Sequence, residues 1–152
     1  MSADPPLSQN RSSSSSIGAR APVWYVWVIG GFLLLQGSST LLFRLVPALD
    51  AAFPALLAIT QMIPIHSMLH IVTGLMGLAI LRAGGARGAW WFALGFGVFY
   101  TGLGLVGQIS GQQLGLGLQP FDHAFHLVAG VPGLLAAAIG YRPLIARREL
   151  AK

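Results

Sequence analysis

The sequence contains no cysteine, which excludes disulfides, thiolate metal ligands, CxxC redox chemistry and thioether attachment of haem. It is also poor in charge. Nine Lys and Arg and four Asp and Glu make up 9% of the 152 residues, whereas soluble domains carry about 25%. With 55% hydrophobic residues, so few charges cannot cover a compact soluble protein. These figures exclude a nucleic-acid-binding domain, a disordered activator and a typical cytosolic enzyme. They predict a small integral membrane protein whose first partner is the lipid bilayer.

Four stretches are long and apolar enough to cross a bilayer, which takes about 20 residues of helix. Their apolar runs are continuous rather than alternating, so helices are predicted and strands are not. We therefore expect an all-α fold, an integral membrane four-helix bundle. The expected spans are residues 23–43, 65–81, 88–109 and 123–141, within a four-transmembrane-helix domain of residues 22–142.

The segments outside the spans differ from them in composition. Residues 1–21 include an unbroken serine run at 12–16 and cannot bury enough apolar surface to offset their ordering entropy, so they are predicted to be a disordered cytoplasmic tail. Residues 143–152 are predicted to be a basic cytoplasmic tail. The stretch 50–62 is too short to cross and is expected to form a short helix on the outer surface.

The cations are distributed unevenly around the spans. The connections after the first and third spans contain one cation between them, Arg44, and the other connection and the two ends contain eight. The positive-inside rule then places both termini in the cytoplasm, which we expect to be that of a bacterium with the chain in its inner membrane. The net charge of +5 follows from this topology, and no nucleic-acid partner is expected. The eight cations are Arg11, Arg20, Arg82, Arg87, Arg142, Arg147, Arg148 and Lys152.

The second and fourth spans begin with similar sequences. Residues 64–78 read PIHSMLHIVTGLMGL, and residues 120–134 read PFDHAFHLVAGVPGL, at a constant offset of 56. This similarity predicts an internal repeat, a duplicated two-helix hairpin whose copies have the same orientation in the membrane. The identical pairs are Pro64 and Pro120, His70 and His126, Val72 and Val128, Gly74 and Gly130, Gly77 and Gly133, and Leu78 and Leu134.

These motifs resemble those of a bacterial family of small four-span membrane proteins classed as a domain of unknown function. That family has an H-L-x-x-G-x-x-G-L start to spans two and four and an Asp shortly before the last one. The matching pieces here are LHIVTGLMGL at 69–78 and FDHAFHLVAGVPGL at 121–134. The resemblance covers roughly residues 24–141 and implies the fold without implying an activity. The chain departs from the family at His66, where Asn or Asp is common, and thereby gains an imidazole.

All four histidines lie in the first two turns of spans two and four, on the outer side of the membrane. His66 and His70 are spaced i, i+4, and His123 and His126 are spaced i, i+3, so each pair lies on one helix face. Asp122 precedes His126 by four residues, within reach of its ring. If the small-residue faces of the two spans meet, the imidazoles gather at the outer mouth of the bundle.

Three interpretations of this cluster remain open. The histidines could be structural, capping helices or meeting lipid headgroups. They could hold a divalent metal, with ligands drawn from His66, His70, His123, His126 and Asp122. They could bind a haem or a chlorophyll-type pigment through His70 and His126, with Gly74 and Gly130 making room for the macrocycle. Ser67 stands where a zincin helix has Glu, so metalloprotease chemistry is not indicated.

The sequence contains few groups that could carry out catalysis. No span has an acidic residue in its middle, and no Ser-His-Asp or paired-carboxylate arrangement is visible. We expect a non-catalytic packing or accessory subunit of a membrane complex, or a homo-oligomer, with other membrane subunits or a second copy as partners. The alternative is a haem-, pigment- or metal-binding membrane protein. A small-solute channel or transporter has the least support.

Overall fold

The computed structural model describes residues 9–60, 62–111 and 115–149, and within these ranges the regular structure is entirely helical. The three long helices are α1 (Gln9–Leu45), α4 (Pro64–Ser110) and α5 (Pro120–Glu149), and the two short ones are α2 (Pro47–Ala52) and α3 (Ala55–Thr60). Parts of all three long helices are long and apolar enough to cross a membrane. The predicted all-α class is therefore confirmed, together with membrane-compatible helices.

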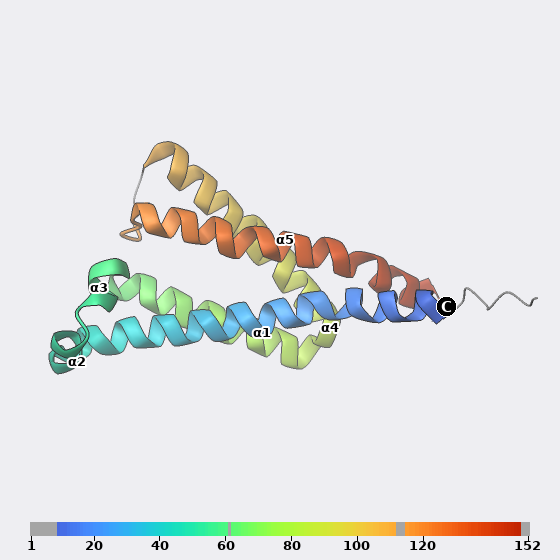
Figure 1. Cartoon of the computed structure of the whole chain (residues 1–152), viewed down its shortest axis with the longest axis horizontal. Coiled ribbons are helices and arrows are strands. Elements are labelled where there is room, and N and C mark those ends of the chain that lie inside the picture. The colour runs from blue at the N-terminus through green and yellow to red at the C-terminus, as the bar shows by residue number, and fades with distance from the viewer. Residues whose placement is uncertain (1–8, 61, 112–114, 150–152) are drawn as a thin grey trace, which may run out of the picture.

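Helix α4 is folded back on itself at Gly85. A straight helix of its 47 residues would be about 70 Å long, more than twice the hydrocarbon thickness of a bilayer. Gly85 interrupts it with φ 54° and ψ −141°, a combination open essentially to glycine alone. We call residues 64–84 the first arm of α4 and residues 86–110 its second arm, and Figure 1 shows the two arms meeting at this turn.

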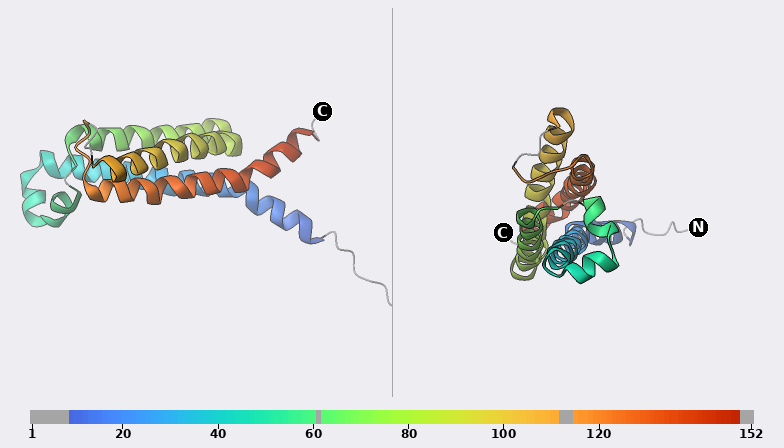
Figure 2. Two further views of the ribbon diagram at one scale, coloured as in Figure 1. Left: turned by 90° about the horizontal axis from the view of Figure 1, so that it is seen from above. Right: turned by 90° about the vertical axis from the view of Figure 1, so that its left-hand side faces the viewer.

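The turns and helix ends gather toward the two ends of the molecule, and the start of α1 and the end of α5 project beyond the Gly85 turn. The Gly85 turn, the start of α1 and the end of α5 lie at one end of the molecule (Figure 2). Helices α2 and α3 and the connection between α4 and α5 lie at the other end. The outer segment expected as one helix forms two, α2 and α3, because Pro54 follows Phe53 where α2 stops.

Glycines set the closest helix contacts. A Cβ at Gly74 on the first arm would lie 2.6 Å from the carbonyl oxygen of Gly30 on α1. A Cβ at Gly130 on α5 would lie 2.5 Å from the backbone nitrogen of Thr101 on the second arm. Helix α1 therefore packs against the first arm and α5 against the second. The expectation that the small-residue faces of the first arm and α5 meet each other is wrong.

The surface of the bundle is apolar. Only 33–39% of the residues in the most apolar window of each candidate span are buried, so most of their Leu, Val and Phe side chains face outward. The buried core is small and runs between α1, α5 and the second arm of α4, where it contains Leu33, Phe96 and Ala129. Such an exposed apolar surface is what a lipid solvent requires of a protein.

Helix α1 begins earlier than the sequence indicates. The serine-rich segment expected to be disordered is helical from Gln9 onward, and residues 1–8 lie outside the described residues. Helix α5 likewise continues to Glu149, through the segment expected to be a basic tail. Extending a formed helix adds a hydrogen bond per residue without a new nucleation step, and serine lowers helix propensity only moderately.

Candidate metal centre

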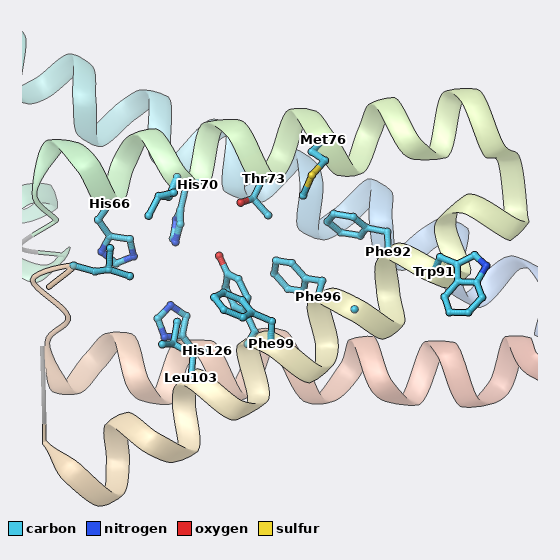
Figure 3. A pocket seen from close by; sticks show the side chains of 14 residues that line it. His66, His70, Thr73, Met76, Trp91, Phe92, Phe96, Phe99, Leu103 and His126 are labelled. Atoms are coloured by element: carbon cyan, nitrogen blue, oxygen red, sulfur yellow. The ribbon is translucent and has the colours of Figure 1, made fainter. Parts of the chain in front are cut away.

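Three imidazoles meet between the first arm of α4 and α5. His66 and His70 stand one turn apart on the first arm, and His126 faces them from α5 (Figure 3). Their residues are only 2%, 2% and 1% exposed. The ring centroid of His66 lies 4.6 Å from that of His70 and 6.2 Å from that of His126. The arrangement is a compact buried cluster contributed by two helices.

Each of these rings has a nitrogen atom that is not used in folding. Nδ1 of His66, Nε2 of His70 and Nδ1 of His126 are buried and have no hydrogen-bond partner among the described residues. One ring nitrogen from each histidine can be chosen so that no two are more than 4.8 Å apart. A buried polar atom without a partner costs about 1–3 kcal/mol, so three of them in one place indicate a ligand site.

A hydrogen bond from Gln36 on α1 orients His70. Nδ1 of His70 lies 2.6 Å from Oε1 of Gln36, and Nε2 of the same amide donates to Sδ of Met62 at 3.2 Å. An amide oxygen only accepts, so Nδ1 of His70 carries the proton and Nε2 presents a lone pair to the cluster. A partner on the far nitrogen is the usual support of a metal-ligating histidine.

Two residues expected at this site lie outside the group of three imidazoles. His123 packs its ring onto Gly107 of the second arm, where any Cβ would overlap it, and its Nδ1 is likewise buried without a hydrogen-bond partner among the described residues. Asp122 accepts a hydrogen bond from the backbone N–H of Gln119 at 2.7 Å, while its own N–H donates to the Gln119 carbonyl at 2.9 Å. This reciprocal pair is a cap for the start of α5. The metal-ligand set expected from the sequence is thus reduced to His66, His70 and His126.

The glycines expected to accommodate a macrocycle face neighbouring helices. Gly74 lies against α1 and Gly130 against Thr101, as described above, so neither leaves space beside the imidazoles. The buried ring of Tyr100 lies 4.9 Å from His126 and 6.5 Å from His70. The Tyr100 ring therefore lies next to the imidazoles, and the haem or pigment interpretation stays a prediction.

A cavity of about 420 Å³ adjoins the three imidazoles, which form its polar end. Its walls are mainly aromatic and come from the second arm. Phe92, Phe96 and Tyr100 stack in sequence there, with centroids 5.4 Å and 3.8 Å apart. Among the described residues that line the cavity there is no Asp or Glu. The site is therefore a neutral nitrogen donor set at the end of an apolar slot.

Gln36 is the site residue that sequence reasoning missed. It is the one amide within the charge-free stretch 23–43, and a polar side chain at membrane depth is by default a sign of function. That signal could have found it. The aromatic wall had no such signal, because Phe and Tyr are ordinary on lipid-facing and helix-packing surfaces.

Comparison with known proteins identifies a family. The model of a family described as a domain of unknown function (DUF4383) matches residues 24–141, the same range over which the motifs at 69–78 and 121–134 resemble such a family. No curated protein and no solved structure matches the chain.

Proposed function

Because the chain belongs to the DUF4383 family, a domain of unknown function, we propose a function from the geometry of its own site. The protein is an integral membrane protein that binds one divalent transition-metal ion through His66, His70 and His126. The observation that carries this proposal is the convergence of three buried imidazoles, each of which offers a ring nitrogen within 4.8 Å of the others. Each ring also has a buried nitrogen without a hydrogen-bond partner among the described residues. Neutral imidazole is a common ligand for zinc, copper, iron and nickel.

The separation of the nitrogens is compatible with an ion. In a tetrahedral site with bonds of about 2.0–2.1 Å, ligand atoms lie about 3.3 Å apart. The ring nitrogens here lie within 4.8 Å of one another. Movements of the rings by about 1 Å, which small side-chain rotations supply, shorten these separations to that value. Three protein ligands leave the fourth position of a tetrahedral ion to an exchangeable ligand.

We also propose that the chain crosses the bilayer four times with both termini in the cytoplasm. The two arms of α4 have 21 and 25 residues by their bounds, and about 20 residues are enough for a span. Arg20, Arg82 and Arg87 lie at the end that holds the Gly85 turn, and Arg44 lies at the opposite end. The positive-inside rule assigns the first end to the cytoplasm, so the metal centre lies toward the outer face.

The proposed duplication of a hairpin has support from matched contacts. Two glycines of α1 that closely approach the first arm have counterparts on the second arm that closely approach α5. The counterparts lie 67 positions later in the sequence, Gly97 for Gly30 and Gly104 for Gly37. Gly30 meets Leu78 and Gly97 meets Leu134, while Gly37 meets Ile71 and Gly104 meets Leu127. Each partner is displaced by the 56 positions of the sequence similarity. We infer that α1 with the first arm, and the second arm with α5, are two copies of one unit.

A role as a packing or accessory subunit stays a prediction. The small-residue faces on which it was based are used inside the chain, because Gly77 packs against Phe92 and Gly133 against Tyr25. Partners such as other membrane subunits or a second copy would have to use the exposed apolar surface instead. Metal binding therefore has the stronger structural support.

The test is metal analysis of the full chain in lipid nanodiscs after loading with Zn²⁺ or Co²⁺. We expect one ion per chain and a Co²⁺ absorption spectrum of the tetrahedral type. His66→Ala, His70→Ala and His126→Ala should each weaken binding by more than about 100-fold, the upper end of what losing a supporting hydrogen bond costs. His123→Ala is the matched control, since it also removes a buried imidazole.

Circular dichroism of each variant separates loss of the site from loss of the fold. Saturating Zn²⁺ should raise the melting temperature of the parent and of His123→Ala, because a ligand stabilises the state that it binds. Folded parent protein that retains no ion, or equal metal binding in all four variants, would overturn the proposal.

A further inference from the structure

We propose that the cavity beside the metal centre binds a fatty carboxylate, a single-chain amphiphile that enters from the bilayer. Its carboxylate completes the coordination of the ion, and its chain lies along the slot between the arms of α4. This inference rests on the proposed function and specifies the ligand of the same site.

The shape of the cavity matches a single chain. On the first arm its lining extends from His66 to Met76, a rise of about 15 Å at 1.5 Å per residue. On the second arm the lining continues as far as Trp91, and Figure 3 shows these residues spread along the space between the helices. The result is an elongated slot with imidazoles at one end and hydrocarbon along the rest, which is the pattern of a fatty acid.

The slot is accessible from the lipid side. Four of its lining residues are strongly exposed: Leu69 is 41%, Met76 48%, Trp91 57% and Phe99 62% exposed. All four belong to α4, within a segment apolar enough to cross the membrane, so the opening between them faces acyl chains. At the outer end the connection before α5 contributes Leu116 to the lining. An apolar solute can therefore enter sideways without passing through water.

The positive charge of the bound ion favours a negatively charged head group on the amphiphile. Three neutral imidazoles do not compensate a divalent ion, and such a charge is costly at membrane depth unless it is paired. In the described part of the chain no acidic side chain lines the cavity. Asp122, which caps the start of α5 through one carboxylate oxygen, interacts electrostatically with His66, but a single carboxylate does not neutralise a divalent ion. A carboxylate from the ligand supplies the missing negative charge. An alcohol of the same chain length fits the slot equally well but lacks this charge.

Gly95 provides a way to block the chain without touching the imidazoles. It lines the cavity, and a Cβ added there meets nothing within 4 Å. A Cβ added at Gly102, on the same arm, also meets nothing within 4 Å, but Gly102 does not line this cavity. Gly95→Leu therefore fills the slot, and Gly102→Leu is its matched control.

The experiment measures binding of radiolabelled palmitate to the full chain in phosphatidylcholine nanodiscs, with and without Zn²⁺, with hexadecanol as the uncharged probe. We expect saturable palmitate binding that weakens about tenfold or more when zinc is removed, because a charge-assisted contact is lost. Gly95→Leu should weaken it similarly while zinc binding persists, and Gly102→Leu should leave both unchanged.

The outcomes separate the two proposals. Stoichiometric zinc without saturable palmitate binding overturns the fatty-carboxylate inference and leaves the metal centre standing. Equal binding of palmitate and hexadecanol, or equal palmitate binding with and without zinc, also overturns it. Absence of zinc from folded protein overturns the metal centre itself, and the inference with it.

Discussion

At the scale of single residues, the orientation of His70 depends on one amide. Gln36 accepts the Nδ1 proton of His70 at 2.6 Å and is held in turn by its contact with Met62. Next to it, the hydroxyls of Thr40 and Ser67 lie 2.9 Å apart and are fully buried. These polar contacts join α1 to the first arm of α4 beside the three-histidine cluster. They explain why an apolar span keeps a glutamine at this position.

We expect Gln36→Leu to weaken Zn²⁺ binding by about 10- to 100-fold, because it removes the partner that fixes the tautomer and orientation of His70. Gln36→Glu keeps an acceptor oxygen and should bind zinc more tightly than Gln36→Leu. Competition with a chromophoric chelator measures the affinities. Gln108→Leu changes an exposed glutamine on α4 and serves as control. Parent-like affinity in Gln36→Leu would remove the supporting role assigned to this residue.

At the scale of elements, the course of α4 depends on one backbone conformation. Two adjacent glycines, Gly84 and Gly85, stand at the turn, but only Gly85 has a positive φ, 54° with ψ −141°. A Cβ at either position meets nothing within 4 Å. The two positions therefore differ in backbone conformation and not in available space, which makes them a matched pair.

Gly85→Ala should destabilise the protein by about 1–3 kcal/mol, since alanine is strained in that region of φ and ψ. Gly84→Ala should be neutral or stabilise by up to about 1 kcal/mol through helix propensity. Unfolding in mixed detergent micelles, followed by circular dichroism, compares the two. Equal stability of both variants would show that Gly85 does not require its positive φ.

The helix interfaces lead to a second prediction at this scale. Gly74→Ala and Gly130→Ala should each destabilise by about 1–3 kcal/mol through overpacking, because their Cβ atoms would lie 2.6 Å and 2.5 Å from the backbone of the facing helix. Gly102→Ala, in open space, should not. The same unfolding measurement applies. Similar costs at Gly74 and Gly130 are expected of equivalent positions in duplicated hairpins, and tolerance of alanine at both would contradict the close packing.

At the scale of the whole molecule, the two ends of the bundle differ in what they hold. One end has the Gly85 turn and the diverging ends of α1 and α5, and the other has α2, α3 and the start of α5. The imidazole cluster belongs to this second end, because His66 lies in the first turn of α4 and His126 in the second turn of α5. A bilayer across the long axis puts these ends in different compartments. Arg44 at the second end donates to the carbonyl of Met62 at 2.5 Å, so this cation holds the connection between α3 and α4 to α1.

The absence of cysteine makes this topology directly testable. Ala52 and Ala83 are exposed and lie at opposite ends of the bundle. In intact bacterial cells a membrane-impermeant maleimide should label Ala52→Cys, and it should label Ala83→Cys only after permeabilisation, because the positive-inside rule predicts that the turn with Arg82 and Arg87 lies in the cytoplasm. The parent chain has no thiol and gives the background. Labelling of both variants from the same side would exclude the four-span arrangement.

The sequence by itself determined the class of the molecule. Continuous apolar runs in a chain with 9% charged residues select lipid as the solvent, and lipid demands helices because every backbone polar group must be paired internally. The i, i+4 spacing of His66 and His70 also settled that these two rings share one face.

Only the tertiary structure decided which residues form the site. A glycine-rich helix face can pack against any neighbouring helix. The sequence therefore did not predict that Gly74 packs against α1 and Gly130 against the second arm of α4. That choice rotates each helix about its axis. It turns His126 toward His66 and His70, and it turns His123 onto Gly107. Helix rotation is fixed by packing between segments distant in sequence, which is why four similar histidines separated into three at the site and one outside it.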